Sequence, residues 1–329
     1  MHAVRFFDGA VALEGTLIVR NGVVHLLDDP APAGAPRLEG LVTGLFTDHH
    51  VHLQLIDYKL LPGSRLGAVV DLGADLDWIS EVADQLSAHE SCPVNVRYAG
   101  PFLTAPGGYP SDRTWAPAGS VREIRDAAAA DAVVAELADA DVSLIKIVAH
   151  SEAGPTLVDA TFEAIVHRAA AHRIPVIAHA EGPGQAQRAA RLGAGRLAHA
   201  PFSERLAPEE IAAQAVSTSW ISTMAIHEGE AYAIVVDNVR RFVAAGGEVV
   251  YGTDMGNGTM PVDLHEAEVD ALREAGIEGD DLLTALAPAD PLIPGAPLLF
   301  LPDDDPNRSR RLTPADLDAL TTDPTDPEH

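Results

Sequence analysis

GLFTDHHVH, residues 44–52, places two histidines at alternate positions directly after an apolar run that predicts a β-strand. Residues i and i+2 of a strand point to the same side, so His50 and His52 can hold one metal ion together. His49, directly before this pair, is expected to point away from it. Alone, an H-x-H pattern is only a hint of metal. Its meaning depends on what lies at the ends of the other strands.

Strand-like and helix-like runs alternate along the chain from about Leu41 onward. This alternation is typical of parallel βαβ units, and eight such units favour a closed barrel over an open sheet. The predicted strands are 41–47, 66–72, 94–99, 142–148, 174–178, 195–198, 219–224 and 247–252. We therefore predict an α/β fold with a (β/α)8 TIM-like barrel over residues 41–290.

Short β-branched runs precede the predicted barrel. Residues 1–40 predict a small β-subdomain with a hairpin turn at Asn21-Gly22, a dipeptide that favours tight hairpins. A further short strand at about 296–302 is expected to pair with these N-terminal strands. Residues 303–329 are expected to form an acidic, Pro-rich C-terminal tail, helical in part and frayed at its end.

Polar residues gather at the C-terminal ends of the predicted strands. Lys146 lies inside the fourth strand, where an amine is costly unless it is paired or modified. His179 closes the fifth strand, His199 the sixth and Asp254 the eighth. Active sites of α/β barrels are built at this face, and a chance arrangement would scatter such residues over both ends. We therefore expect them to meet the histidine pair of the first strand.

As a set, these residues resemble the amidohydrolase superfamily. GLFTDHHVH is similar to that family's first-strand motif, Asp-x-His-x-His, with Asp48 at its first place. The lysine, two histidines and aspartate named above match the later ligands in the expected order, over about residues 40–260. The loop YAGPFLTAPGGYP, residues 98–110, resembles the branch of prolidases and imidazolonepropionase-like hydrolases. Members of that branch often carry a histidine where this chain has Tyr109.

The resemblance implies a binuclear centre of two divalent metal ions, with zinc the expected metal and manganese, cobalt or nickel as alternatives. Lys146 would be carboxylated by CO2, and the resulting carbamate would bridge both ions. A lysine at this place points to the two-metal branch of the family. The other implied ligands are His50, His52 and Asp254 for the more buried ion, and His179 and His199 for the second ion.

The activity that the resemblance implies is hydrolysis of an amide-type C–N bond in a cyclic amide, an N-acyl compound or a dipeptide-like small molecule. A hydroxide that bridges the metals would attack, and Asp254 would shuttle the proton to the leaving nitrogen. A deaminase, or a lactonase or phosphotriesterase, would use the same centre on other bonds. A non-catalytic barrel scaffold is the alternative from another class of protein.

Four residues on the predicted active face are candidates for substrate contact. Tyr109 would hydrogen-bond a substrate carbonyl, with an ordinary glycine turn and a surface tyrosine as the alternative. His150 shares strand parity with Lys146 and would reach the pocket mouth or pack in a loop. His227 follows the seventh strand, and it or Tyr232 would contact the substrate.

The composition of the chain limits the classes of partner that we expect it to bind. The chain has 329 residues and a formal net charge of −27. Nucleic acid and anionic membranes are bound by clusters of Lys and Arg, so this charge argues against both as partners. We expect a small-molecule substrate, no nucleic acid and no membrane, and the sequence leaves a homo-oligomer open. Cys92 is the only cysteine, so no intrachain disulfide is expected. With no signal-peptide pattern or apolar run of about 20 residues, we expect a cytoplasmic protein.

Overall fold

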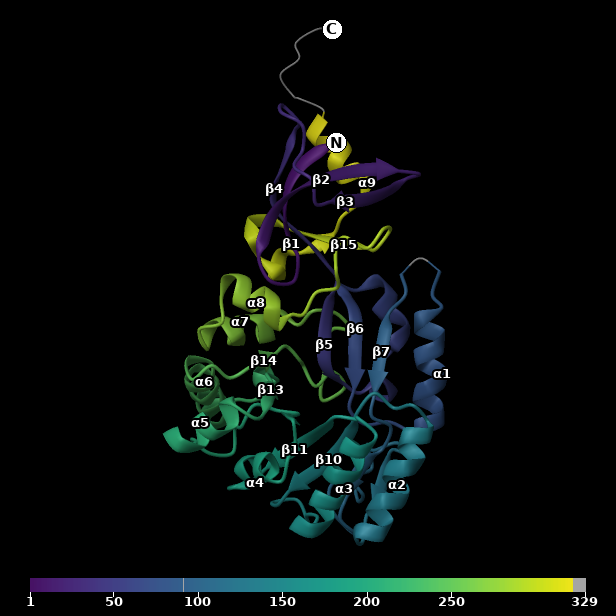
Figure 1. Ribbon diagram of the computed structural model, residues 1–329, viewed down its shortest axis with the longest axis vertical. Helices are drawn as coiled ribbons and strands as arrows, with labels where there is room; N and C mark the ends of the chain where they lie inside the picture. The colour runs from purple at the N-terminus through teal and green to yellow at the C-terminus, as the bar shows by residue number, and fades with distance from the viewer. Residues whose placement is uncertain (91, 322–329) are drawn as a thin grey trace.

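The computed structural model describes residues 1–90 and 92–321. An antiparallel-rich sheet stands at one end of the molecule, and parallel strands with their helices make up the rest (Figure 1). The sheet at the end has the strand order β16-β15-β4-β1-β2-β3. Its strands are β1 (His2–Phe7), β2 (Ala12–Arg20), β3 (Val23–Leu27), β4 (Arg37–Gly44), β15 (Leu298–Leu301) and β16 (Arg310–Arg311).

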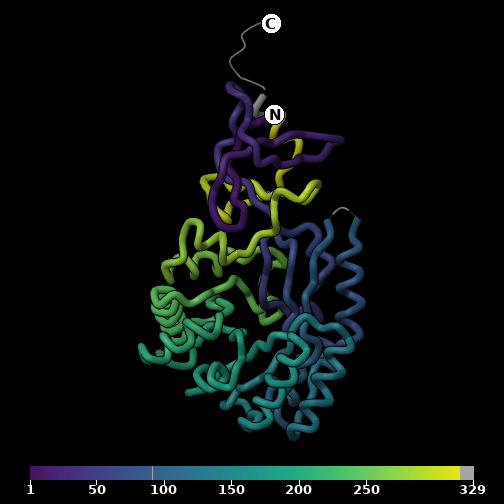
Figure 2. Tube along the Cα trace, viewed as in Figure 1, coloured from purple at the N-terminus to yellow at the C-terminus, as the bar shows by residue number. Residues whose placement is uncertain are grey.

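The six-stranded sheet joins the two ends of the described chain. β2 and β3 form a hairpin whose turn residues, Asn21 and Gly22, both have positive φ, as a tight hairpin turn requires. β15 pairs antiparallel with β4, and β1 pairs parallel with β4. The yellow segment that holds β15 therefore lies against the purple N-terminal strands (Figure 2). The final part of the predicted tail, residues 322–329, lies outside the described residues.

The parallel strands form two sheets rather than the one closed ring that the sequence predicts. One sheet has the order β5-β6-β7, and the other has the order β14-β13-β12-β11-β10-β8-β9. Their strands are β5 (Phe46–Val51), β6 (Leu66–Asp71), β7 (Asn95–Tyr98), β8 (Phe102–Thr104), β9 (Val121–Glu123), β10 (Ile145–His150), β11 (Val176–Glu181), β12 (Arg196–Leu197), β13 (Ser219–Ile221) and β14 (Val249–Val250).

Helices follow most of these strands along the chain. The α-helices are α1 (Leu76–Ser87), α2 (Ala127–Asp139), α3 (Asp159–Ala171), α4 (Gln185–Arg191), α5 (Pro208–Ala215), α6 (Gly229–Ala244), α7 (Glu266–Glu274), α8 (Gly279–Ala285) and α9 (Pro314–Thr321). Short 3-10 turns are η1 (Leu53–Leu55), η2 (Tyr58–Gly63), η3 (Met224–Ile226), η4 (Pro302–Asp304) and η5 (Pro306–Arg308). Within residues 1–90 and 92–321, no helix has the length and apolar character that crossing a membrane requires.

The prediction of one strand over 41–47 is wrong, because that run is divided between two sheets. β4 ends at Gly44 in the six-stranded sheet, and β5 begins at Phe46 in the parallel sheet. A Cβ atom on Gly44 would lie 2.1 Å from the carbonyl oxygen of Ala289, so only glycine allows this close approach. The amide of Ala289 donates to the carbonyl of Leu45, 2.8 Å away, and fixes the crossing point.

The ladder between β5 and β6 is irregular where the histidine motif begins. Its register shifts between Asp48 and Val51, so the chain leaves regular pairing at His49 and His50. Backbone bonds nevertheless link the two sheets. The amide of His49 on β5 donates to the carbonyl of Tyr251 after β14 at 3.0 Å, and the amide of Ser143 before β10 donates to the carbonyl of Tyr98 on β7 at 3.0 Å. The two sheets thus enclose a common interior.

Apolar side chains from these strands fill that interior. A buried cluster draws on β6 and on the strands from β10 to β14, and so packs between the two sheets. Its members are Val70, Leu72, Ala99, Leu144, Ile177, Ala198, Ile221 and Val250. This cluster forms a dry apolar layer. The inward-facing residues that come next along the strands therefore lie above or below it.

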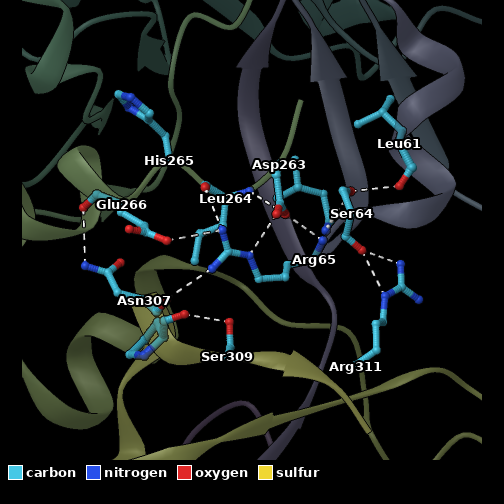
Figure 3. Close-up of polar contacts among 12 residues, drawn as sticks. Leu61, Ser64, Arg65, Asp263, Leu264, His265, Glu266, Asn307, Ser309 and Arg311 are labelled. Atoms are coloured by element: carbon cyan, nitrogen blue, oxygen red, sulfur yellow. Dashed lines mark hydrogen bonds and ion pairs between the residues drawn. The ribbon is translucent and has the colours of Figure 1, made fainter. Parts of the chain in front are cut away.

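A polar network ties the C-terminal segment to the start of β6 (Figure 3). The Arg65 side chain donates to Asp263 at 3.0 Å, to the carbonyl of Leu264 at 3.1 Å and to that of Asn307 at 3.3 Å. Arg311 donates to the carbonyl of Ser64 at 2.9 Å. Because the Arg65 side chain is only 15% exposed, these bonds are shielded from water.

Replacing Arg65 should destabilise the fold more than replacing an exposed arginine. We expect Arg65→Ala to lower the free energy of unfolding by about 2 to 4 kcal/mol, because it leaves Asp263 partly buried without its partner. Arg122→Ala, which breaks a half-exposed pair with Glu136, is the control and should cost at most about 1 kcal/mol. Urea denaturation followed by circular dichroism measures both, and equal losses would contradict the prediction.

Candidate metal centre

Two histidines and one aspartate converge at the end of β5. The Nε2 atoms of His50 and His52 each lie 3.1 Å from Oδ1 of Asp254. Asp254 follows β14 in a left-handed backbone conformation, with φ of 57°, which turns its carboxylate toward β5. The ligand atoms of all three residues lie within 4.8 Å of one another, and all three residues are buried.

The chemistry of this donor set fits a cation. Nδ1 of His50 lies 2.8 Å from the carbonyl oxygen of Ala198, so Nδ1 carries the proton and Nε2 presents a lone pair to Asp254. Burial lowers the pKa of His50 well below its usual value. Burial alone would raise the pKa of Asp254, but the nearby imidazoles outweigh it and the pKa lies well below the ordinary range. A neutral His50 imidazole that faces an ionised Asp254 carboxylate is the combination of protonation states that metal ligation needs.

Two further histidines extend the cluster. The His199 ring lies 4.7 Å from that of His50 and 4.8 Å from that of His179, measured between ring centroids. Nδ1 of His199 contacts Oγ1 of Thr223 at 2.9 Å, which orients the ring and leaves Nε2 free. A second set of imidazole donors therefore adjoins the first.

Lys146 lies on β10 within the same cavity and is only 1% exposed. Burial lowers the pKa of its amine to about 7, although Asp254 and Asp71 act in the opposite direction. A large fraction of the amine is therefore neutral and nucleophilic near neutral pH. The chain has only two lysines, Lys59 and Lys146, among 22 basic residues, so arginine supplies its positive charge almost everywhere else. A lysine here meets a need that arginine, which stays protonated, cannot meet.

These groups line one cavity of about 570 Å³. Four aromatic residues, Phe102, Tyr109, Trp115 and Phe202, contribute to the rest of its wall. The lining residues are His50, His52, Leu55, Phe102, Tyr109, Trp115, Lys146, Val148, His179, Glu181, His199, Phe202, Ile226, His227, Asp254, Gly256, Asn257 and Gly258. All six residues that the sequence suggested as metal ligands are among them.

Glu181 is the polar residue of this cavity that the sequence reasoning missed. Its Oε2 lies 3.0 Å from Nε2 of His179 and 3.3 Å from Nε2 of His150. Burial acts to raise the pKa of Glu181, but the two histidines lower it overall. The signal was available in the sequence, because Glu181 stands two residues after His179 and so shares its side of β11.

The four candidates for substrate contact fall in different places. Tyr109 and His227 line the cavity, and burial raises the pKa of Tyr109 to about 12. Nε2 of His227 is buried and has no hydrogen-bond partner among the described residues. His150 lies behind the lining, against Glu181. The suggestion of Tyr232 is not supported, because α6 turns its hydroxyl away to donate to Glu274 at 2.8 Å.

Asp48 and His49 of the opening motif support the site from outside the donor set. Oδ2 of Asp48 accepts from the hydroxyl of Thr253 at 2.6 Å, and Oδ1 accepts from the amide of His50 at 3.0 Å. Asp48 thus ties the end of β5 to the segment that carries Asp254. His49 points away from the donors, as expected, with Nδ1 3.0 Å from the carbonyl oxygen of Tyr251.

Comparison with known proteins rests on structure alone. No protein-family model matches the sequence, and no curated protein matches it. Among solved structures, a putative prolidase from Bifidobacterium longum aligns with a TM-score of 0.70 at 20% identity, over 97% of each chain. A Xaa-Pro dipeptidase with bound methionine aligns with a TM-score of 0.70 at 14% identity, over 97% of this chain and 96% of that one.

A third solved structure is a bottromycin amidohydrolase, with a TM-score of 0.65 at 19% identity, over 97% of this chain and 88% of that one. The alignments span nearly the whole of this chain, including the six-stranded sheet at its end. The chain therefore shares its fold with these solved structures, whose names are prolidase, dipeptidase and amidohydrolase.

Proposed function

We propose that this chain is a metal-dependent hydrolase that cleaves an amide-type C–N bond in a small molecule. The observation that carries the proposal is the convergence of His50, His52 and Asp254 on one point at the edge of a cavity. Solved structures with the same fold bear the names prolidase, dipeptidase and amidohydrolase, which supports the same type of bond here.

We further interpret the two parallel sheets as two arcs of a (β/α)8 barrel. Backbone hydrogen bonds link the two sheets, and the apolar cluster between them resembles the packed interior of such a barrel. In this interpretation the donors stand at the C-terminal face of the strands, where barrel enzymes build their active sites.

We infer a centre of two divalent ions, with zinc as the expected metal. His50, His52 and Asp254 would hold one ion, and His179 and His199 would hold the other. Lys146 would supply a further ligand as a carbamate: its neutral Nζ would attack the carbon of CO2, one N–C bond would form as one C–O π bond opens to an oxygen anion, and a proton would leave the nitrogen. The resulting anion offers two oxygens where the amine offers one nitrogen.

The ions would supply positive charge that polarises a carbonyl and lowers the pKa of water. The remaining chemistry belongs to the side chains. Asp254 is held on its outer oxygen by Asn257, whose Nδ2 donates to Oδ2 at 2.8 Å. That contact aims Oδ1 inward, where it can take a proton from attacking water and return it to the leaving nitrogen.

The wall of the cavity suggests the shape of the substrate. Phe102, Tyr109, Trp115 and Phe202 give it aromatic surface, and Glu181 and the histidines give it polar groups. An N-acyl amino acid or a dipeptide-like molecule combines an apolar body with an amide and a charged end. We propose this class ahead of cyclic amides, lactones and phosphotriesters.

Removing one metal-binding histidine should abolish both metal and activity. We expect His50→Ala to lose bound zinc and to lower hydrolysis of dipeptides and N-acyl amino acids at least about 100-fold. His167→Ala, on the exposed side of α3, is the matched control and should behave like the unaltered protein. Metal analysis and a panel that also includes lactones and phosphotriesters test this. Full activity in the His50 variant would refute the site.

The carbamate has a clean test because the chain has only two lysines. After incubation with 13C-bicarbonate, NMR should show one carbamate carbon in the unaltered protein and in Lys59→Ala, and none in Lys146→Ala. Lys146→Ala should also lose activity, with partial rescue by short carboxylic acids that supply the missing oxygens. An active protein with a single metal ion and no such carbon signal would favour deaminase-like, one-metal chemistry.

A further inference from the structure

A second cavity, of about 260 Å³, opens at the opposite end of the parallel strands. It shares no lining residue with the metal cavity. Its walls come from the beginnings of strands, including Ser143 before β10, Pro175 before β11 and Gly195 before β12. Nothing in the proposed hydrolysis uses it.

Two arginines, Arg97 on β7 and Arg196 on β12, line this cavity, and no acidic residue does. Arg196 is held in place because its Nε donates to the hydroxyl of Ser219 at 2.7 Å. The nearest acid, Glu248, is 67% exposed, and its oxygen lies 3.8 Å from Nη2 of Arg196. The terminal nitrogens of Arg196 thus have only a long, solvated contact.

Arg97 has no recorded ion pair or hydrogen bond through its side chain in residues 1–90 and 92–321. The two guanidinium groups are close enough to affect each other. Burial is the largest cause that lowers the pKa of Arg196, and the positive charge of Arg97 also lowers it. His49 is a third polar residue of the lining. Arg97 is exposed and the Arg196 side chain is 25% exposed, so both guanidinium groups are open to a ligand that enters from solvent.

The floor of the cavity is apolar. Val70, Leu144 and Ile177 line it and belong to the dry layer between the sheets. Leu144 stands two positions before Lys146, and Ile177 stands two positions before His179, on the same face of each strand. Lys146 and His179 both line the metal cavity. Two residues of a strand span about 7 Å, so a single layer of side chains separates the two cavities.

We propose that this second cavity binds a small organic carboxylate, with its anionic head between Arg97 and Arg196 and a short apolar body on the Val70–Leu144–Ile177 floor. Arginine pairs with carboxylates through two parallel N–H···O bonds, and the wall supplies two arginines. The volume suits a molecule smaller than those that fill typical ligand pockets, which measure about 300 to 1,000 Å³. The apolar floor favours a carboxylate with a hydrocarbon body over inorganic phosphate. The inference does not depend on the hydrolase activity.

Ligand-observed NMR titration of the metal-loaded protein with butanoate tests the proposal, with inorganic phosphate as the second probe. We expect saturable butanoate binding at millimolar concentrations, weakened about tenfold or more in Arg97→Ala. Arg97→Gln, which keeps the length of the side chain but not its charge, should show a similar loss. Arg122→Ala removes an exposed arginine elsewhere and should leave binding unchanged.

The outcomes separate this cavity from the metal centre. Butanoate held by the metal ions would bind the Arg97 variants as tightly as the unaltered protein, and that result would overturn the proposal. So would a failure of butanoate to bind at all. Phosphate binding as tight as butanoate binding, and equally sensitive to Arg97, would overturn the assignment to an organic carboxylate. Circular dichroism of each variant confirms that the fold is intact.

Discussion

Two buried imidazoles that face one buried carboxylate form the interaction around which the rest of the site is arranged. Nε2 of His50 presents a lone pair to Oδ1 of Asp254 at 3.1 Å, and Nε2 of His52 lies 3.1 Å from the same oxygen. Lone pairs and a negative oxygen at that distance repel each other unless a proton or a metal ion lies between them. Burial disfavours the protonated form of His50, so a cation of another kind completes this contact best.

Several features elsewhere in the fold serve this arrangement. The ladder of β5 breaks its register at the histidine motif, Asp48 ties β5 to the segment after β14, and Asp254 takes a left-handed backbone conformation. Each costs some regular hydrogen bonding or some backbone strain. The apolar layer beneath holds the strands firmly enough to keep these local departures in place. It also separates the metal cavity from the cavity of Arg97 and Arg196 at the other end.

Much of the candidate site could be predicted from the sequence because strand geometry is periodic. Alternate residues of a strand share a side, and the ends of parallel strands share a face, so His179 and His199 could be placed near His50 without coordinates. The same rule reaches Glu181, two residues after His179. It fails for Tyr232, because the direction of a side chain on α6 depends on how that helix packs against α7 and Glu274.

The sequence by itself determined which residues are candidates for the site, since residue type and strand parity are local properties. It also determined the α/β class, through the alternation of apolar strands and helices. Only the tertiary structure decided how the strands divide into sheets. The run 41–47 splits at Gly44 because a backbone carbonyl from residue 289, far along the chain, lies where a side chain would stand. Arg97 and Arg196 likewise line one cavity although their strands are distant in sequence, and no local sequence pattern predicts this.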